Sequence, residues 1–400
     1  MPTWSPELRG RECDCGKRIQ PTRSGSLALW MAFAALTVAC GQRDSTARLA
    51  PALPPTAAMT RSVNVYNWAD NIDPDVIADF EKTTGIKVVY NTYDTQELME
   101  TRMLVGSSGF DVVDVASYSL DRLVPAGVFR KLDRQLLPGL GNLDPDLMKS
   151  LAEFDPGNEH AVGYMWGTTA IGYNARALRK LAPDAPTDSW RLIYDPRVLA
   201  KLAHCGVSFT DARPEIIGTA LLYVGADVNH AAALDVAAAA RVLGAIRPYV
   251  GKIHGESQIS DLSSGAMCLM ITAGTNVAIA RIRAREAGLD ADLRYVIPKE
   301  GTISWFDTLA IPVDAPHPSE AYAFLDFMMH PDVAAKNANY VGSTTFNRAA
   351  VPLVNAALRD DRMLYPDAEI RARLRPLHAR SNEASRAEAR IWTRFETARM

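Results

Sequence analysis

From residue 62 onward, apolar stretches of strand length alternate with stretches of helical periodicity. The first apolar stretch, 63–68, predicts a strand, and Asp73 with Pro74 opens a helix that Gly85 closes. Pro at the first helical position and Gly just past the last are common signals of helix ends. The next predicted elements are strands at 86–90 and 111–115 and helices at 95–105 and near Leu120. This order predicts a mainly parallel sheet with helices on both faces.

The same alternation returns in the second half of the chain. The predicted elements there are strands at 205–209, 267–271, 293–297 and 309–312, and helices at 215–223, 231–246, 276–287 and 319–329. A final helix places Ile391, Trp392 and Phe395 on one face, and the Arg-rich tail 371–399 is interpreted as a solvated helix face. Two such units predict two α/β lobes with a cleft, and ligands of such sheets bind beyond the carboxyl ends of the strands.

The first 40 residues follow a different pattern. Basic residues precede an apolar run, 27–39, which is shorter than the about 20 residues that a membrane span needs and is typical of a signal peptide, 1–40. Cys40 follows Ala39 as in a lipidation site, although Thr37 stands where such sites carry an aliphatic residue. Ordinary cleavage after Ala39 is the alternative. Either route predicts export to the periplasm, and residues 41–61 have the composition of a flexible tether.

Charge and cysteine content narrow the function further. Lys and Arg total 43 against 46 acidic residues, so no cationic field is available for a nucleic acid. Loss of residues 1–40 leaves Cys205 and Cys268 as the cysteines of the folded part. In an oxidising compartment they predict one disulfide, and two buried free thiols are the alternative.

The sequence offers binding residues rather than catalytic motifs. Nucleophile-elbow, phosphate-loop and His-Glu-x-x-His motifs are absent, and the seven His residues are dispersed. We therefore predict no enzyme, no metal and no other cofactor. Near predicted strand ends stand Trp68 with Asp70, Tyr118, and Trp305 with Asp307. Aromatic faces beside carboxylates suit an organic ammonium, whereas a core Trp and a turn Asp are the alternatives at 68 and 70.

Several long collinear stretches then resemble one family, the periplasmic polyamine-binding receptors of ABC importers, and within it the putrescine-binding branch. The stretches are 65–74 (VYNWADNIDP), 80–90 (FEKTTGIKVVY), 106–113 (GSSGFDVV), 164–174 (YMWGTTAIGYN), 205–209 (CGVSF), 297–301 (IPKEG) and 331–333 (PDV). The resemblance covers about residues 62–395.

This resemblance implies an α/β fold of the type II periplasmic binding protein class. Two crossings, near 166–169 and 301–304, would form a hinge between the lobes, which close around a ligand. The implied lobe 1 is 62–166 plus 304–345, and the implied lobe 2 is 167–303 plus 346–400.

The resemblance also implies a set of ligand-binding residues. Trp68 would stack on the ligand, Asp70 and Asp307 would hold one ammonium group, and Glu215 would hold the second. Without the resemblance, Glu215 is an acid favoured by the dipole of a first helical turn. Trp305 and Tyr118 match aromatic contacts to the ligand chain. Cys205 and Cys268 match the disulfide of the family.

The chain departs from the putrescine branch at several pocket positions. Thr272 and Thr275 replace a Trp and an Asp that would contact the ligand, Ser343 replaces a Tyr, and Ala116 replaces a Ser. Loss of a carboxylate beside a buried ammonium group costs about 2 to 5 kcal/mol of binding. We therefore expect a cationic amine whose far end is bulkier or uncharged, with putrescine as one candidate.

The predicted function is an extracytoplasmic receptor that delivers a polyamine or related organic cation to an inner-membrane ABC permease. We expect the folded part to be a monomer, with a lipid anchor if Cys40 is modified. A ligand-responsive sensor that signals to a membrane partner is the alternative, and permease genes beside the gene would distinguish the two.

Overall fold

The computed structural model describes residues 61–253 and 257–398. The predicted signal peptide, the lipidation site at Cys40 and nearly all of the predicted tether lie outside the described residues. Within the described ranges, no helix combines the length and the apolar character that crossing a membrane requires.

The helices and strands agree in type with most of the predicted elements. The strands are β1 (Ser62–Asn67), β2 (Lys87–Thr92), β3 (Val112–Ala116), β4 (Ala161–Asn174), β5 (Val207–Phe209), β6 (Lys252–Ile253), β7 (Leu269–Ala273), β8 (Leu293–Val296), β9 (Thr302–Ala310), β10 (Thr344–Thr345) and β11 (Leu374–Pro376). The α-helices are α1 (Pro74–Thr84), α2 (Gln96–Val105), α3 (Ser117–Leu123), α4 (Pro145–Leu151), α5 (Ala175–Leu181), α6 (Arg191–Tyr194), α7 (Pro196–Leu202), α8 (Arg213–Tyr223), α9 (Ala233–Ile246), α10 (Gln258–Ser264), α11 (Gly274–Glu286), α12 (Pro318–Met328), α13 (Pro331–Val341), α14 (Ala356–Arg359), α15 (Ala368–Arg371) and α16 (Asn382–Glu396). Short 3-10 helices are η1 (Arg134–Leu136), η2 (Pro138–Asn142), η3 (Ala203–Cys205), η4 (Arg247–Tyr249) and η5 (Val351–Leu353).

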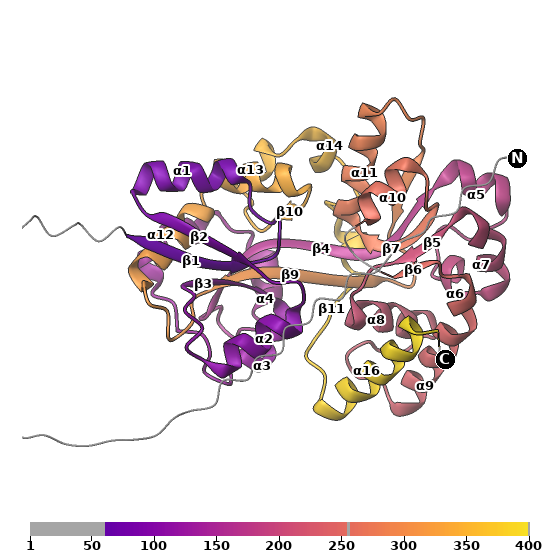
Figure 1. Ribbon diagram of the computed structural model, residues 1–400, viewed down its shortest axis with the longest axis horizontal. Helices are drawn as coiled ribbons and strands as arrows, with labels where there is room; N and C mark the ends of the chain where they lie inside the picture. The colour runs from indigo at the N-terminus through magenta and orange to yellow at the C-terminus, as the bar shows by residue number, and fades with distance from the viewer. Residues whose placement is uncertain (1–60, 254–256, 399–400) are drawn as a thin grey trace, which may run out of the picture. The chain divides into compact units, whose positions relative to one another are not determined.

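The strands form one mixed sheet, in the order β2-β1-β3-β9-β4-β7-β5-β6. The outer strands pair in parallel on both sides, whereas β3, β9, β4 and β7 pair antiparallel in the centre. The prediction of a mainly parallel sheet is therefore wrong for the centre. Figure 1 shows β4 and β9 as the two long strands that connect the two ends of the sheet.

β9 differs most from its prediction. A short strand was expected at 309–312, but β9 begins at Thr302 and pairs with β4 over most of its length. Trp305 and Asp307 thus lie within a strand rather than after one. They are the two half-buried positions in an otherwise buried strand, so they point toward the same face. Burial of both faces of a strand removes the alternation that marks a strand in a sequence.

Two hydrophobic cores lie at the two ends of these long strands. The first surrounds β1 and β3 and includes Trp166 and Phe306, and the second surrounds β5 and β7 and includes Ala170 and Ile303. Both β4 and β9 therefore leave one core and enter the other between these residues. The lobe boundaries given above stay a prediction. We use lobe 1 and lobe 2 below for the sides of the first and second core.

The helix ends follow the local signals in the sequence. Asp73 caps α1 through its side chain, which accepts a hydrogen bond from the Asp75 amide, and Gly85 ends the helix in the left-handed conformation with φ 68°. Thr95 caps α2 in the same way.

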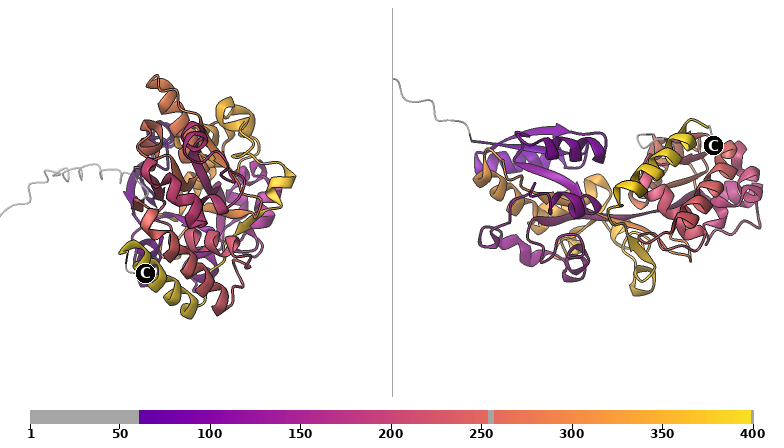
Figure 2. Two further views of the ribbon diagram at one scale, coloured as in Figure 1. Left: turned by 90° about the vertical axis from the view of Figure 1, so that its right-hand side faces the viewer. Right: turned by 90° about the horizontal axis from the view of Figure 1, so that it is seen from below.

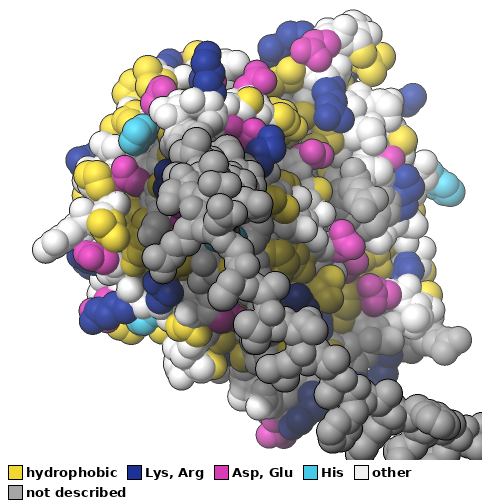
Figure 3. All heavy atoms as spheres, turned by 60° about the vertical axis from the view of Figure 1, so that its left-hand side comes forward, with side chains coloured by type: hydrophobic (Ala, Val, Ile, Leu, Met, Phe, Trp, Pro, Cys, Tyr) yellow, Lys and Arg dark blue, Asp and Glu magenta, His cyan; other side chains and the backbone are white. Residues whose placement is uncertain are grey.

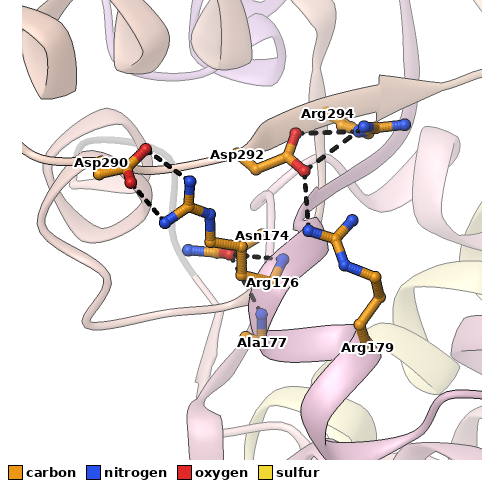
Figure 4. A network of polar contacts seen from close by, with 7 residues as sticks. All are labelled: Asn174, Arg176, Ala177, Arg179, Asp290, Asp292 and Arg294. Atoms are coloured by element: carbon orange, nitrogen blue, oxygen red, sulfur yellow. Dashed lines mark hydrogen bonds and ion pairs between the residues drawn. The ribbon is translucent and has the colours of Figure 1, made fainter.

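One disulfide and a surface network of hydrogen bonds connect elements of lobe 2. The predicted disulfide is present between Cys205 and Cys268, with the two Cα atoms 5.5 Å apart, and it joins the residues that precede β5 and β7. On the surface, the carboxylate of Asp292 accepts hydrogen bonds from Arg179 and Arg294 and ties the end of α5 to β8 (Figure 4). Both contacts are exposed, so each contributes little to stability.

The final helix, α16, packs against α8 and α9 (Figure 2). Trp392 and Phe395 are buried, as their predicted common face requires. The interpretation of the tail as a solvated face is wrong for Glu388, which is 3% exposed and pairs with Arg380 at 3.1 Å.

Candidate functional site

A cleft of about 840 Å³ opens between residues of the two lobes. It is lined by Trp68, Asp94, Thr95, Gln96, Glu97 and Tyr118 from lobe 1 and by Thr210, Asp211, Ala212, Arg213, Pro214, Glu215, Ser257, Trp392 and Glu396 from lobe 2. Five of these side chains are acidic, and Arg213, which donates to Glu97 at 2.9 Å, is the single base in the lining. Acidic and basic side chains are interspersed on the coloured part of the face in Figure 3.

Trp68 follows β1 directly and forms part of the cleft wall. Its ring lies 4.4 Å from that of Tyr93, centroid to centroid. The hydroxyl of Tyr90 donates to the Trp68 carbonyl at 2.8 Å. The side chain is half-buried against the first core. Trp68 is therefore both a core residue and a candidate ligand contact, because one side packs on the core and the other is available to a ligand.

Asp70 differs from the other predicted acids in its exposure. It is exposed, has a left-handed backbone with φ 54°, and is not among the residues that line the cleft. Asp307 is not among the lining residues either, so the predicted pairing of Asp70 with Asp307 stays a prediction.

Glu215 lines the cleft, whereas Trp305 and Asp307 lie on β9 and are not among the lining residues. Glu215 stands in the first turn of α8, and its carboxylate accepts a hydrogen bond from the hydroxyl of Thr169 on β4. The Trp305 indole N–H donates to the same hydroxyl at 3.3 Å. Burial raises the pKa of Glu215 to about 7 against the opposing effect of the Thr169 hydrogen bond.

Asp307, like Glu215, is an acid whose pKa is raised by its surroundings. Burial, and then the negative charge of Glu215, raise its pKa to about 7. Tyr118 lies nearby on α3, and burial followed by the charges of Glu215, Glu97, Glu100 and Asp307 raises its pKa well above the usual value. These groups lie close enough to raise one another's pKa, and a bound cation would favour their ionised forms.

Sequence reasoning missed another acid, Asp114. It is the central residue of β3 and is fully buried. Burial and the charge of Asp307 raise its pKa well above the ordinary value, while hydrogen bonds from Tyr93 and Trp68 lower it. An acid inside a run of valines was the available signal, because charged side chains are almost never buried without a partner.

The predicted pocket threonines are buried. The Thr272 hydroxyl donates to the Gln258 side-chain oxygen at 2.7 Å and accepts from the Asn276 amide at 3.0 Å. Thr275 lies in the first turn of α11 and is 9% exposed. Neither lines the cleft.

The other two departures are also buried. Ser343 is 2% exposed. Ala116 lies directly opposite Asp307 in the β3–β9 register.

These features suit binding without catalysis. Five acids and the rings of Trp68, Tyr118 and Trp392 line the cleft, and a cation enclosed there would meet carboxylates and ring faces. Among the described residues, no group of three or more His, Cys, Asp or Glu side chains is arranged to hold a metal ion. The fold and cleft define a two-lobed ligand-binding protein.

Comparison with known proteins identifies the family. The chain belongs to the bacterial extracellular solute-binding protein family, whose model matches residues 75–361. It is 42% identical over 345 residues to the putrescine-binding periplasmic protein PotF of Escherichia coli, covering 86% of this chain and 93% of the relative. It is also 42% identical over 344 residues to the putrescine-binding periplasmic protein SpuD of Pseudomonas aeruginosa, covering 86% of this chain and 94% of that relative.

A solved structure supports the same relationship. A spermidine/putrescine ABC transporter protein from Listeria monocytogenes matches with a TM-score of 0.76 and 31% identity, over 85% of this chain and all of that chain. The type II binding-protein fold and the resemblance to polyamine receptors are thereby confirmed. The chain is an extracytoplasmic solute-binding protein and not an enzyme, as members of this family bind solutes for transport.

Proposed function

We propose that the chain captures a cationic amine of the polyamine class in the cleft and delivers it to an ABC importer of the inner membrane. The observation that carries this proposal is the local excess of acid beside aromatic rings: five acidic side chains and one paired base line the cleft. The names of the relatives, which bind putrescine or spermidine, support the same ligand class.

Within this proposal, the half-buried residues have separate roles. Trp68 and Trp305 present ring faces to the methylene chain, and Asp307 and Glu215 accept hydrogen bonds from ammonium groups. Tyr118 contributes a further ring. Asp70, Trp305 and Asp307 lie outside the lining of the cleft, and Thr272 and Thr275 are buried, so these five residues would reach a ligand only after a rearrangement such as closure of the lobes.

Isothermal titration calorimetry against putrescine, cadaverine, agmatine and spermidine tests the proposal. We expect saturable binding of at least one amine, and a loss of about tenfold or more for Glu215→Gln and for Asp307→Asn. Asp290→Asn is the matched control, because Asp290 is a highly exposed acid away from the cleft lining. Absence of binding by every amine, or equal binding by all three variants, contradicts the proposal.

The assembly and anchoring of the receptor belong to the same proposal. We expect the folded part to act as a monomer, which light scattering tests. A lipid on Cys40 would tether it to the membrane, and mass spectrometry of the mature N-terminus distinguishes lipidation from cleavage after Ala39.

A further inference from the structure

Asp114 and Asp307 occupy neighbouring positions on one face of the sheet. In the antiparallel register of β3 and β9, Ala116 lies opposite Asp307. Asp114 is two residues from Ala116, so its side chain points to the same face as that of Asp307. The two acids are therefore diagonal neighbours, a relationship in which side chains still interact.

The surroundings of this pair contain no positive charge. Tyr93 donates to Asp114 Oδ1 at 3.3 Å, and the Asn71 amide donates to Oδ2 at 3.3 Å. The titratable groups that face the pair are Tyr90, Tyr93, Tyr118, Tyr164 and Glu215. In the part of the chain that the structure describes, no Lys, Arg or His side chain pairs with either carboxyl group.

Two neighbouring carboxyl groups in such a site do not both ionise readily. The charge of Asp307 raises the pKa of Asp114, and burial raises the pKa of both. Such a pair titrates as a unit, and one proton shared between the two groups removes most of the repulsion. A bound cation would remove it equally well.

We propose that Asp114 and Asp307 form one ammonium-binding carboxyl pair, which holds a single proton in the empty protein and releases it when the cationic end of an amine binds. The carboxyl O–H bond breaks, the proton passes to solvent, and the ammonium group keeps its own protons. The pair changes its charge from −1 to −2 as the +1 head arrives. This inference rests on the proposed function, since it requires an amine in the cleft.

The pair also defines the class of amine. Asp114 and Asp307 place acid near Trp68, whereas the Thr272 hydroxyl of lobe 2 is neutral and already bonded to Gln258 and Asn276. An amine with a primary ammonium group at one end fits this distribution. Asp114 is a specificity-determining residue in this arrangement, although it is covered by other side chains and acts through Asp307.

Calorimetry with putrescine, cadaverine, agmatine and spermidine, in buffers that differ in ionisation enthalpy, measures the released proton. For an amine that binds, we expect release of up to about one proton from the pair and an affinity that rises by up to about tenfold per pH unit while the pair is protonated. Asp114→Asn should remove this release. Glu215→Gln, which removes the other acid with a pKa of about 7, should retain it. Equal release by Glu215→Gln and by a double variant that carries both Glu215→Gln and Asp114→Asn overturns the inference.

Infrared spectroscopy of the ligand-free protein tests the shared proton without an amine. In the Glu215→Gln background at neutral pH, we expect the carbonyl stretch of a protonated carboxyl group, and Asp114→Asn should abolish it. Asp307→Asn provides a second variant if Asp114→Asn does not fold. An unchanged band in both overturns the shared proton. If no amine binds, the proposed function and the release step fail together, and the band still decides whether the pair holds a proton.

Discussion

The hydrogen bonds of the Thr169 hydroxyl lead to a specific prediction about ligand affinity. It donates to Glu215 and accepts from Trp305, so it connects an acid of lobe 2 with an aromatic ring on β9. Thr169 is 1% exposed and lies on β4 between the two cores. Thr169→Val keeps the shape of the side chain and removes both hydrogen bonds.

The expected effect follows from the charge on Glu215. A hydrogen bond to a charged group contributes about 1.5 to 3 kcal/mol, so its loss should raise the Glu215 pKa by about 1 to 2 units. The pKa starts at about 7, and at neutral pH most Glu215 side chains would then be protonated. An ammonium group would lose its partner, and affinity should fall about 10- to 100-fold.

Calorimetry of Thr169→Val at about pH 7 and about pH 9 checks this reasoning, because Glu215 ionises again at the higher pH and part of the affinity should return. Thr308→Val is the matched control. Thr308 is equally buried and adjacent to Asp307, but its hydroxyl donates to the Val115 carbonyl at 2.7 Å. Equal affinities of the two variants, or a loss at Thr169 that does not change with pH, would refute the role of this hydroxyl.

Three further predictions concern packing, covalent structure and pH. A Cβ atom at Gly167 would lie 2.4 Å from the Trp305 ring, so Gly167→Ala should displace that ring, alter its fluorescence and weaken amine binding, whereas Gly141→Ala, with open space around its Cβ, should do neither. Replacing both cysteines of the disulfide, which are 63 residues apart, by serine should lower the free energy of unfolding by about 4 kcal/mol in denaturant titrations, and an unchanged midpoint would contradict this. The pKa of Glu215 is raised to about 7 on folding, so its contribution to stability is present below the ordinary pKa and is lost as pH rises through 7. Thermal melts of the empty protein should therefore show a loss of stability between pH about 4 and about 8, and about 3 kcal/mol of that loss should be absent in Glu215→Gln; parallel pH profiles would exclude it.

The elements with local signals could be predicted from the sequence. Asp73, Pro74 and Gly85 define the ends of α1, and the structure has this helix where the sequence predicts it. The disulfide followed from export and from the number of remaining cysteines. These features depend on neighbouring residues or on composition, and both are visible without tertiary structure.

The features that depend on distant residues could not be predicted in this way. β9 extends through Trp305 and Asp307 because β4 pairs with it across the region between the cores. Asp114 becomes a neighbour of Asp307 only through the register of β3 and β9. A sequence read in order cannot supply a pairing between residues that are almost 200 positions apart.

The position of the acids explains why a protein of nearly neutral composition can be selective for a cation. The acid expected at Thr275 is absent, and Asp114 supplies an acid near Trp68 instead. Burial makes each isolated charge there unfavourable, and a proton or a cation relieves that cost equally. The empty protein therefore favours protonation of the buried carboxyl groups Asp114, Asp307 and Glu215, and an ammonium group competes with those protons. Such competition makes the affinity depend on pH, and a neutral solute of the same length would gain nothing from displacing a proton.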